Sequence, residues 1–272
     1  MRGLEKKTSL PYNYIMADDG NKSSLGRKIF FLYPSALTQN QVVAELAQEE
    51  FEVYIVKDEA KLRRVLKQYP DSIVFANISD GMKENAWEEW IRSIMGNPET
   101  AGVDIGIIAS IPDENLRKKY TELLKVRCGY TVIKSNVSAI IKQLITILNC
   151  VDAKGRRKYI RVLMDNAAHT TVNIPMHGTF VNGIIKDISV VGFSCSFADD
   201  PELTKNKLFS DIQIRLQSQL LKTEGIAFGS RMDGTEKVYV ILFTQRIDPD
   251  IRTRIRKYIQ STLQSRMDNE LK

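Results

Sequence analysis

The 272-residue sequence has few of the side chains from which metal centres and nucleophilic active sites are built. It holds two histidines, His169 and His177, and three scattered cysteines, Cys128, Cys150 and Cys195, none of them in a CxxC pair. A zinc site would have too few ligands, and the odd number of separated cysteines favours reduced, small core residues of a cytoplasmic protein. Because no nucleophile–base pair, metal-ligand cluster or glycine-rich phosphate loop appears either, the sequence predicts a binding protein and not an enzyme.

Long hydrophobic runs are also missing. No apolar stretch approaches the roughly 20 residues that span a bilayer, and the N-terminus has no apolar signal-peptide core, so we expect neither a membrane span nor secretion. The net charge is +6, and it is unevenly placed. Residues 1–151 carry 20 basic against 19 acidic side chains, whereas residues 152–272 carry 19 against 14. The second half therefore favours an anionic partner.

Residues 1–25 are polar and aperiodic, and they predict a flexible tail. From Arg27 onward, short apolar runs alternate with stretches of helical periodicity. Five such runs, each followed by a helix, predict a parallel sheet covered on both faces, in a domain over residues 26–151. Asp58 and either Ser135 or Asn136 are expected to cap helices. The runs are "KIFFLYP" (28–34), "FEVYIV" (51–56), "SIVFANI" (72–78), "VDIGIIAS" (103–110) and "YTVIK" (130–134).

A different rhythm follows the polar linker "DAKG" (152–155). Seven or so short segments rich in β-formers, separated by turn residues, predict a small antiparallel barrel within residues 152–272. The stretch after residue 247 reads as an amphipathic helix with Asp248 as its cap and Pro249 in its first turn. Its apolar face is expected to dock on the barrel, on the other domain or on a partner. That face holds Ile251, Ile255, Ile259 and Leu263.

The five βα units resemble the response-regulator receiver, a flavodoxin-like fold, over roughly residues 27–150. Receivers hold magnesium with an acidic pair after the first strand, where this sequence has Tyr33 and Pro34, or Pro34 and Ser35. Asn77 stands at the position of the phospho-acceptor aspartate, and an amide cannot form an acyl phosphate. Without a carboxylate cluster, a hard divalent ion has no oxygen ligands. The resemblance therefore implies a pseudo-receiver that serves as a docking or dimerisation surface for a protein partner.

Other positions of this domain leave alternatives. Ser110 and Lys134 match the serine or threonine and the lysine that end the fourth and fifth strands of receivers. Asp80 is a candidate substitute acceptor, although capping of the following loop is the favoured interpretation. Trp87 and Trp90, three residues apart on one helix, fit a core position better than a partner-binding face.

The stretch "RRKYIRV" (156–162) opens the second domain with an RxxxR pair, Arg157 and Arg161. Twenty-five residues separate Arg161 from "DISVVG" (187–192), which has the pattern DxSxxG. In this order and spacing, on a strand-rich background, the two motifs resemble the PilZ domain, a small β-barrel that binds cyclic di-GMP. The resemblance covers residues from about 154 to 259, and it implies that cyclic di-GMP is the ligand, with no cofactor or metal.

The residue chemistry fits a cyclic dinucleotide. The planar fork of Arg157 or Arg161 pairs with phosphate oxygens or with guanine O6 and N7. Asp187 can accept from guanine N1–H and N2–H₂, Ser189 adds a hydroxyl, and Gly192 lets the backbone turn tightly or approach the ligand closely. Arg156 occupies the position where PilZ domains place an arginine that stacks on a second ligand molecule, so we expect an intercalated ligand dimer.

Three alternatives to a ligand-driven receptor stay open. The arginine pair also fits a solvated basic linker, and Asp187 and Ser189 also fit a turn in which both side chains bond nearby backbone. A nucleic-acid-binding regulator would suit the basic second half, but no helix-turn-helix pair appears and no nucleic acid is expected. A barrel that binds nothing and serves as a scaffold is the third. The favoured function is a cyclic di-GMP receptor in which the ligand reorients the two domains.

Overall fold

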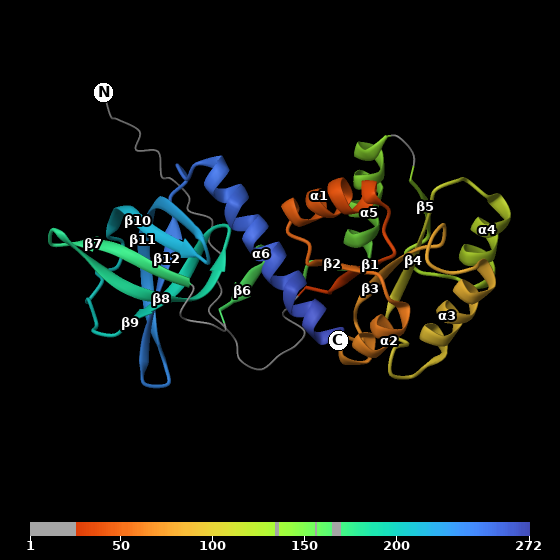
Figure 1. The fold of residues 1–272 in the computed structure, drawn as a ribbon, viewed down its shortest axis with the longest axis horizontal. Coiled ribbons are helices and arrows are strands. Elements are labelled where there is room, and N and C mark those ends of the chain that lie inside the picture. The colour runs from red at the N-terminus through yellow and green to blue at the C-terminus, as the bar shows by residue number, and fades with distance from the viewer. Residues whose placement is uncertain (1–25, 134–135, 156, 165–169) are drawn as a thin grey trace, which may run out of the picture.

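The chain folds into an α/β domain and a β-barrel, with one long helix lying between them (Figure 1). This computed structural model describes residues 26–133, 136–155, 157–164 and 170–272. The fold class predicted from the sequence is confirmed for both parts. The predicted division at residues 151 and 152 falls between the helix that ends the first part and the strand that begins the second.

The α/β domain is built on a five-stranded parallel sheet with the strand order β2-β1-β3-β4-β5. Strand β2 is therefore an edge strand. The elements are β1 (Ile29–Leu32), the π-helical turn η2 (Thr38–Val42), α1 (Val43–Gln48), β2 (Val53–Val56), α2 (Glu59–Gln68), β3 (Ile73–Asn77), α3 (Glu84–Gly96), β4 (Asp104–Ala109), α4 (Glu114–Lys118), the π-helical turn η3 (Lys119–Leu123), β5 (Tyr130–Val132) and α5 (Val137–Cys150).

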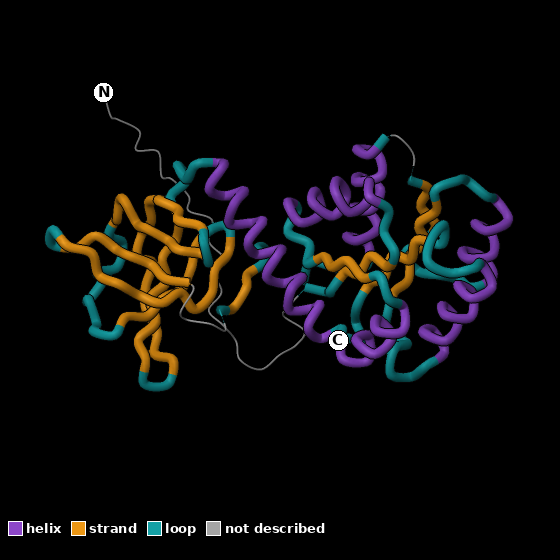
Figure 2. The backbone as a smooth tube through the Cα atoms, in the orientation of Figure 1, coloured by secondary structure: helices purple, strands orange, loops and turns teal. Residues whose placement is uncertain are grey.

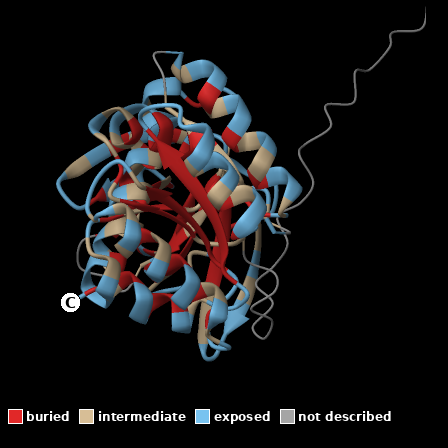
Figure 3. Cartoon of the chain, turned by 90° about the vertical axis from the view of Figure 1, so that its right-hand side faces the viewer, coloured by how far each residue is buried: buried red, intermediate tan, exposed pale blue. Residues whose placement is uncertain are grey.

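Both faces of this sheet are buried, as the continuous apolar runs predict. Successive side chains of a strand point to opposite faces, so Phe30 and Leu32 enter one core layer while Ile29 and Phe31 enter the other. Helices α1 and α5 cover one face, and α2 and α3 cover the other (Figure 1). The strands stand out as a buried layer inside a shell of exposed helix surface (Figure 3).

Local signals in the sequence account for where several helices begin. The Asp58 carboxylate accepts a hydrogen bond from the Lys61 amide at 2.8 Å, which confirms its predicted role as a cap. Asn136 caps α5 through a 3.1 Å bond from the Ala139 amide, and the other candidate, Ser135, lies outside the described residues. Each cap satisfies an amide that the first turn of a helix leaves unpaired.

The second domain is a closed six-stranded antiparallel barrel. The ring runs β8-β7-β10-β11-β12-β9 and closes because β8 pairs with both β7 and β9, while β6 joins the ring only along β8. Closure removes the unpaired edges that an open sheet would expose. The elements are β6 (Arg161–Leu163), β7 (Thr170–Met176), β8 (Thr179–Ser189), β9 (Gly192–Phe197), β10 (Leu208–Leu216), β11 (Gln219–Asp233), β12 (Glu236–Phe243) and the closing helix α6 (Pro249–Glu270).

Helix α6 contacts both domains, which settles a question that the sequence left open. Asp248 caps it through a 2.8 Å bond from the Asp250 amide, and Pro249 stands in its first turn. The first half packs on the barrel through Ile255 and Ile259. The second half crosses to the α/β domain, where Met267 and Leu271 are buried in the core beside α2 and α3. Figure 2 shows the helix running from the barrel strands to the α/β helices.

Candidate functional site

Because β6 pairs with β8, the RxxxR motif and the DxSxxG motif lie side by side. In the antiparallel register, Arg161 lies opposite Ser189 and Leu163 lies opposite Asp187. A one-residue slip would turn the side chains of β6 to the other face. The register is fixed by Val162, which is buried in the barrel core between Arg161 and Leu163. The apolar residues of the "RRKYIRV" stretch thus anchor the strand that carries the second motif arginine.

Asp187 is the buried centre of this cluster. Its side chain lies on the barrel wall with one oxygen, Oδ2, accepting a hydrogen bond from the Ser194 hydroxyl of the neighbouring strand β9. The other oxygen, Oδ1, is 4.0 Å from Nη1 of Arg161, and no donor among the described residues makes a hydrogen bond to it. A buried carboxylate oxygen with its hydrogen-bonding capacity unused is costly, and it marks a position where a donor group of a ligand would be stabilised.

Arg157 belongs to the same electrostatic cluster. Burial lowers the pKa of its guanidinium, the nearby charge of Arg161 lowers it further, and Asp187 acts in the opposite sense. The structure therefore brings Arg157, Arg161 and Asp187 together although Arg157 and Asp187 are thirty residues apart in the sequence. Two cations and one anion leave a net positive charge in a partly buried site, which suits an anionic ligand. Arg156 lies outside the described residues.

Ser189 closes the turn between β8 and β9. Its hydroxyl donates to the Gly192 carbonyl at 3.1 Å and accepts from the Val191 amide at 3.4 Å. This is the local bonding that the turn interpretation of the motif predicts. For Asp187 the same interpretation is wrong, since the Asp187 side chain bonds Ser194 across the strands and not the adjacent backbone. The two motif residues therefore have different structural roles.

Gly192 is required by the packing of the barrel itself. A Cβ atom at this position would lie 2.3 Å from the carbonyl oxygen of Ile241 and 3.0 Å from the Cα of Leu242, both on β12. Backbone atoms cannot rotate away as a flexible side chain can, so any side chain here would push β9 and β12 apart. The close approach that the motif glycine permits is thus between two strands.

Several residues that hold the site were not singled out in the sequence. Glu50, in the turn that follows α1 in the other domain, accepts a 3.1 Å hydrogen bond from the Ile160 amide. Arg266 of α6 donates to the Leu163 carbonyl. Nothing in the sequence near Glu50 signals this contact, which depends on how the domains meet. For Ser194 the sequence holds a weak indication of its role, because it is a polar residue between the core residues Phe193 and Cys195 on the strand that begins at the motif glycine.

The receiver-like site at the carboxyl end of β1 and β3 is filled by protein. Asn77 is buried and donates to the Tyr33 carbonyl at 2.7 Å, and Tyr33 has a left-handed backbone with φ of 52°. The Tyr33 ring lies against Gly81 and meets Trp87 edge-on at 6.0 Å, while its hydroxyl donates to Glu59. A magnesium ion would need carboxylates where this ring stands.

The other residues that the sequence analysis compared with receivers have separate structural roles. The Asp80 carboxylate accepts a 2.7 Å bond from the Gly81 amide, so it orders the loop as expected. Ser110 is exposed, and its amide donates to the Ser79 hydroxyl; Lys134 lies outside the described residues. The predicted core position of Trp87 and Trp90 is confirmed, with exposures of 0% and 3%. Within the described ranges, no three His, Cys, Asp or Glu side chains gather to form a metal site.

Comparison with known proteins gives structural matches alone. No protein-family model matches the sequence, and no curated protein matches it. Similar solved structures include YcgR from Escherichia coli in complex with c-di-GMP (14% identity, TM-score 0.38, 43% of this chain and 50% of that chain). They also include the c-di-GMP complex of K. pneumonia MrkH (16%, 0.38, 43% and 57%). A third is the Mn(2+)-bound response regulator Rcp1 (18%, 0.37, 45% and 92%).

The chain spans about half the length of the YcgR and MrkH structures that it matches. The PilZ domain of YcgR from Escherichia coli with c-di-GMP is also among the similar structures (14%, 0.35, 42% and 96%). Of the helices in the described part of the chain, all are too short or too polar to cross a bilayer.

Proposed function

We propose that the chain is a cyclic di-GMP receptor that binds the dinucleotide on the barrel surface beside β6 and β8, and that it is not an enzyme. The observation that carries the proposal is the meeting of the RxxxR and DxSxxG motifs in one cluster, with Arg161 and Asp187 in contact across the β6–β8 pair. Two motifs that are separated in the sequence need not meet in the fold. Their meeting supports a shared ligand.

The chemistry of the cluster matches the two parts of this ligand. Arg157 and Arg161 supply the cations that two phosphodiesters require, and a guanidinium pairs with phosphate in a bidentate geometry. Asp187 Oδ1, which makes no hydrogen bond within the described residues, is the acceptor for guanine N1–H and N2–H₂. Adenine offers no N1–H donor, so this carboxylate selects guanine over adenine.

The proposed output is a change in how the two domains meet, passed to a protein partner through the receiver-like domain. The RxxxR segment, defined here as residues 157–164, contacts the barrel through β8, the α/β domain through Glu50 and the closing helix through Arg266. A ligand that moves this segment therefore acts on all three. A ligand shifts such an equilibrium only by its difference in affinity for the two arrangements.

Calorimetric titration of cyclic di-GMP into the full chain tests the proposal. Arg157→Ala and Arg161→Ala each remove a charge-assisted contact and are expected to weaken binding by about ten- to a hundredfold. Lys158→Ala, which removes an exposed cation from the same segment, is the matched control and should keep nearly the wild-type affinity. Asp187→Asn should weaken cyclic di-GMP binding while leaving any weak binding of cyclic di-AMP in place.

Two results would contradict the receptor. Wild-type protein that gives no binding leaves the scaffold alternative. Equal losses in all three basic variants would indicate a general electrostatic attraction, as expected for a solvated basic linker.

A further inference from the structure

The candidate site is closed in this arrangement of the chain. Asp187 and Ser189 are 4% and 2% exposed, and the Arg161 side chain is only 14% exposed. Strand β6 pairs alongside this part of β8, Nη1 of Arg161 lies 4.0 Å from the Asp187 carboxylate, and Arg157 is near enough for their charges to interact. A dinucleotide cannot reach Oδ1 of Asp187 until these side chains and the RxxxR segment move.

The RxxxR segment is held down by a contact from the other domain. The Glu50 carboxylate accepts from the Ile160 amide through Oε2 and from Nη2 of Arg256 through Oε1, both at 3.1 Å. We call this three-residue arrangement the Glu50 contact. The Glu50 side chain is 12% exposed and that of Arg256 is 22% exposed, so the pair is shielded from most of the solvent. Ile160 directly precedes Arg161, and motion of one requires motion of the other.

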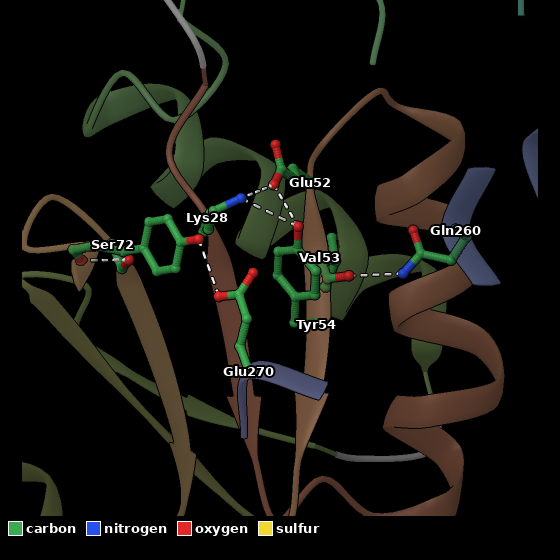
Figure 4. Close-up of polar contacts among 8 residues, drawn as sticks. Lys28, Glu52, Val53, Tyr54, Ser72, Gln260 and Glu270 are labelled. Atoms are coloured by element: carbon green, nitrogen blue, oxygen red, sulfur yellow. Dashed lines mark hydrogen bonds and ion pairs between the residues drawn. The ribbon is translucent and has the colours of Figure 1, made fainter. Parts of the chain in front are cut away.

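The Glu50 contact is the first of a series along α6. One face of the helix, with positions four residues apart, follows the edge strand β2. The Gln260 side chain donates to the Val53 carbonyl at 2.7 Å, and Gln264 both accepts from the Ile55 amide and donates to the Ile55 carbonyl, each at 2.9 Å. Figure 4 shows Gln260 reaching the Val53 carbonyl.

These glutamine amides occupy the place of a neighbouring strand. An edge strand presents unpaired amides and carbonyls that can recruit another chain, and here side-chain amides satisfy them. The contact between α6 and the α/β domain continues with Met267 and Leu271 in the α/β core, and with the Tyr69 hydroxyl, which donates to Glu270 at 3.0 Å. Arg256, Gln260 and Gln264 lie on one rigid helix, so release at its first contact reduces the support of the next.

Resting on the proposed function, we propose that the Glu50 contact has two effects: it holds the ligand site closed, and it keeps α6 on β2. Ligand binding and α6 docking therefore oppose each other. The RxxxR segment must leave Glu50 to admit the ligand, which removes the Ile160 amide from Oε2 of a carboxylate whose side chain is only 12% exposed. A largely buried carboxylate oxygen without a donor is destabilising, and it weakens the Glu50–Arg256 pair that helps to seat α6. By linkage, a change that weakens the closed arrangement strengthens ligand binding by up to the same factor.

The test uses the full chain, with Glu50→Ala and Arg256→Ala as two independent ways to remove the contact. Glu49→Ala and Arg252→Ala are the matched controls, because both are exposed and change the charge by the same amount on the same helices or their ends. In calorimetry with cyclic di-GMP, the two variants are expected to bind about three- to tenfold tighter than the wild type, with both controls unchanged. This gain is opposite in sign to the general loss that misfolding produces.

Hydrogen exchange at β2 gives the second measurement. The Ile55 amide donates to Gln264, so its exchange rate reports the seating of α6 without any ligand. Faster exchange in Glu50→Ala than in Glu49→Ala is expected, as is faster exchange in the wild type when cyclic di-GMP is added. Two results overturn this inference alone. In the first, the wild type binds and both variants bind equally well or more weakly. In the second, adding cyclic di-GMP to the wild type leaves the exchange rate of the Ile55 amide unaltered. A wild type that does not bind overturns the proposed function, and this inference with it.

Discussion

Replacing Gly192 with alanine tests whether this motif glycine serves the barrel or the ligand. The added Cβ would lie 2.3 Å from the Ile241 carbonyl oxygen, so β9 and β12 must separate by several tenths of an ångström. Overpacking of this kind costs about 1–3 kcal/mol. We expect the upper end, because the clash is with backbone and because Gly192 pairs with Leu242 in the β9–β12 ladder of the barrel. At about 3 kcal/mol, amides that exchange by opening of the barrel should exchange about a hundredfold faster.

Hydrogen exchange of β9 and β12 in the full chain measures this effect without assuming that the two domains unfold together. Gly229→Ala is the control, because it lies on the same barrel in β11 and an added Cβ there would have no neighbour within 4 Å. Its exchange should be unchanged or slower, since alanine has less freedom than glycine in the unfolded chain. Equal exchange rates of the β9 and β12 amides in Gly192→Ala and Gly229→Ala would refute the argument. A direct role of Gly192 toward the ligand would then be favoured.

Two further predictions concern charge. Hydrogen bonds from Tyr239 and Lys237 lower the pKa of the Asp200 carboxyl to about 2; because the folded-state pKa is depressed, its stabilisation is present above the ordinary value near 4 and is lost as the pH falls toward 2. The difference in thermal midpoint between wild type and Asp200→Asn should therefore shrink between about pH 4 and pH 2, and a constant difference would argue against the pair. Arg156→Ala should lower the calorimetric stoichiometry from two ligands per chain to one, whereas one ligand per wild-type chain would contradict the intercalated dimer.

The two domain folds could be predicted because their signals are local. Each strand of the α/β sheet has an apolar residue at nearly every position, as burial on both faces requires, and the barrel strands alternate with turn residues. Motif order and spacing predicted a common ligand for Arg161 and Asp187, but not the contact between the two side chains. What supports their meeting physically is the β6–β8 register, which the buried Val162 fixes.

The contacts between the domains could not be predicted. The apolar stripe of α6 indicated a docking face, and Met267 and Leu271 continue it beyond Leu263 at the same four-residue spacing. What the sequence does not show is that their burial takes place in the core of the other domain. Glutamines on an exposed helix face carry no signal that they bond an edge strand. The role of Ser189 was ambiguous for a related reason: the same hydroxyl suits a turn or a ligand, and only the fold places it 3.1 Å from the Gly192 carbonyl.

The burial of Met267 and Leu271 in the α/β core has a consequence for synthesis of the chain. The first domain emerges from the ribosome well before these residues, since its bond from Gln264 to Ile55 spans 209 positions. Domains usually fold as they emerge. Until α6 has been synthesised, this domain therefore has an incomplete core and an unpaired β2 edge, and an unpaired edge strand can pair with other chains. Expression of the α/β domain alone should reproduce that vulnerable state permanently, and addition of an α6 peptide should relieve it.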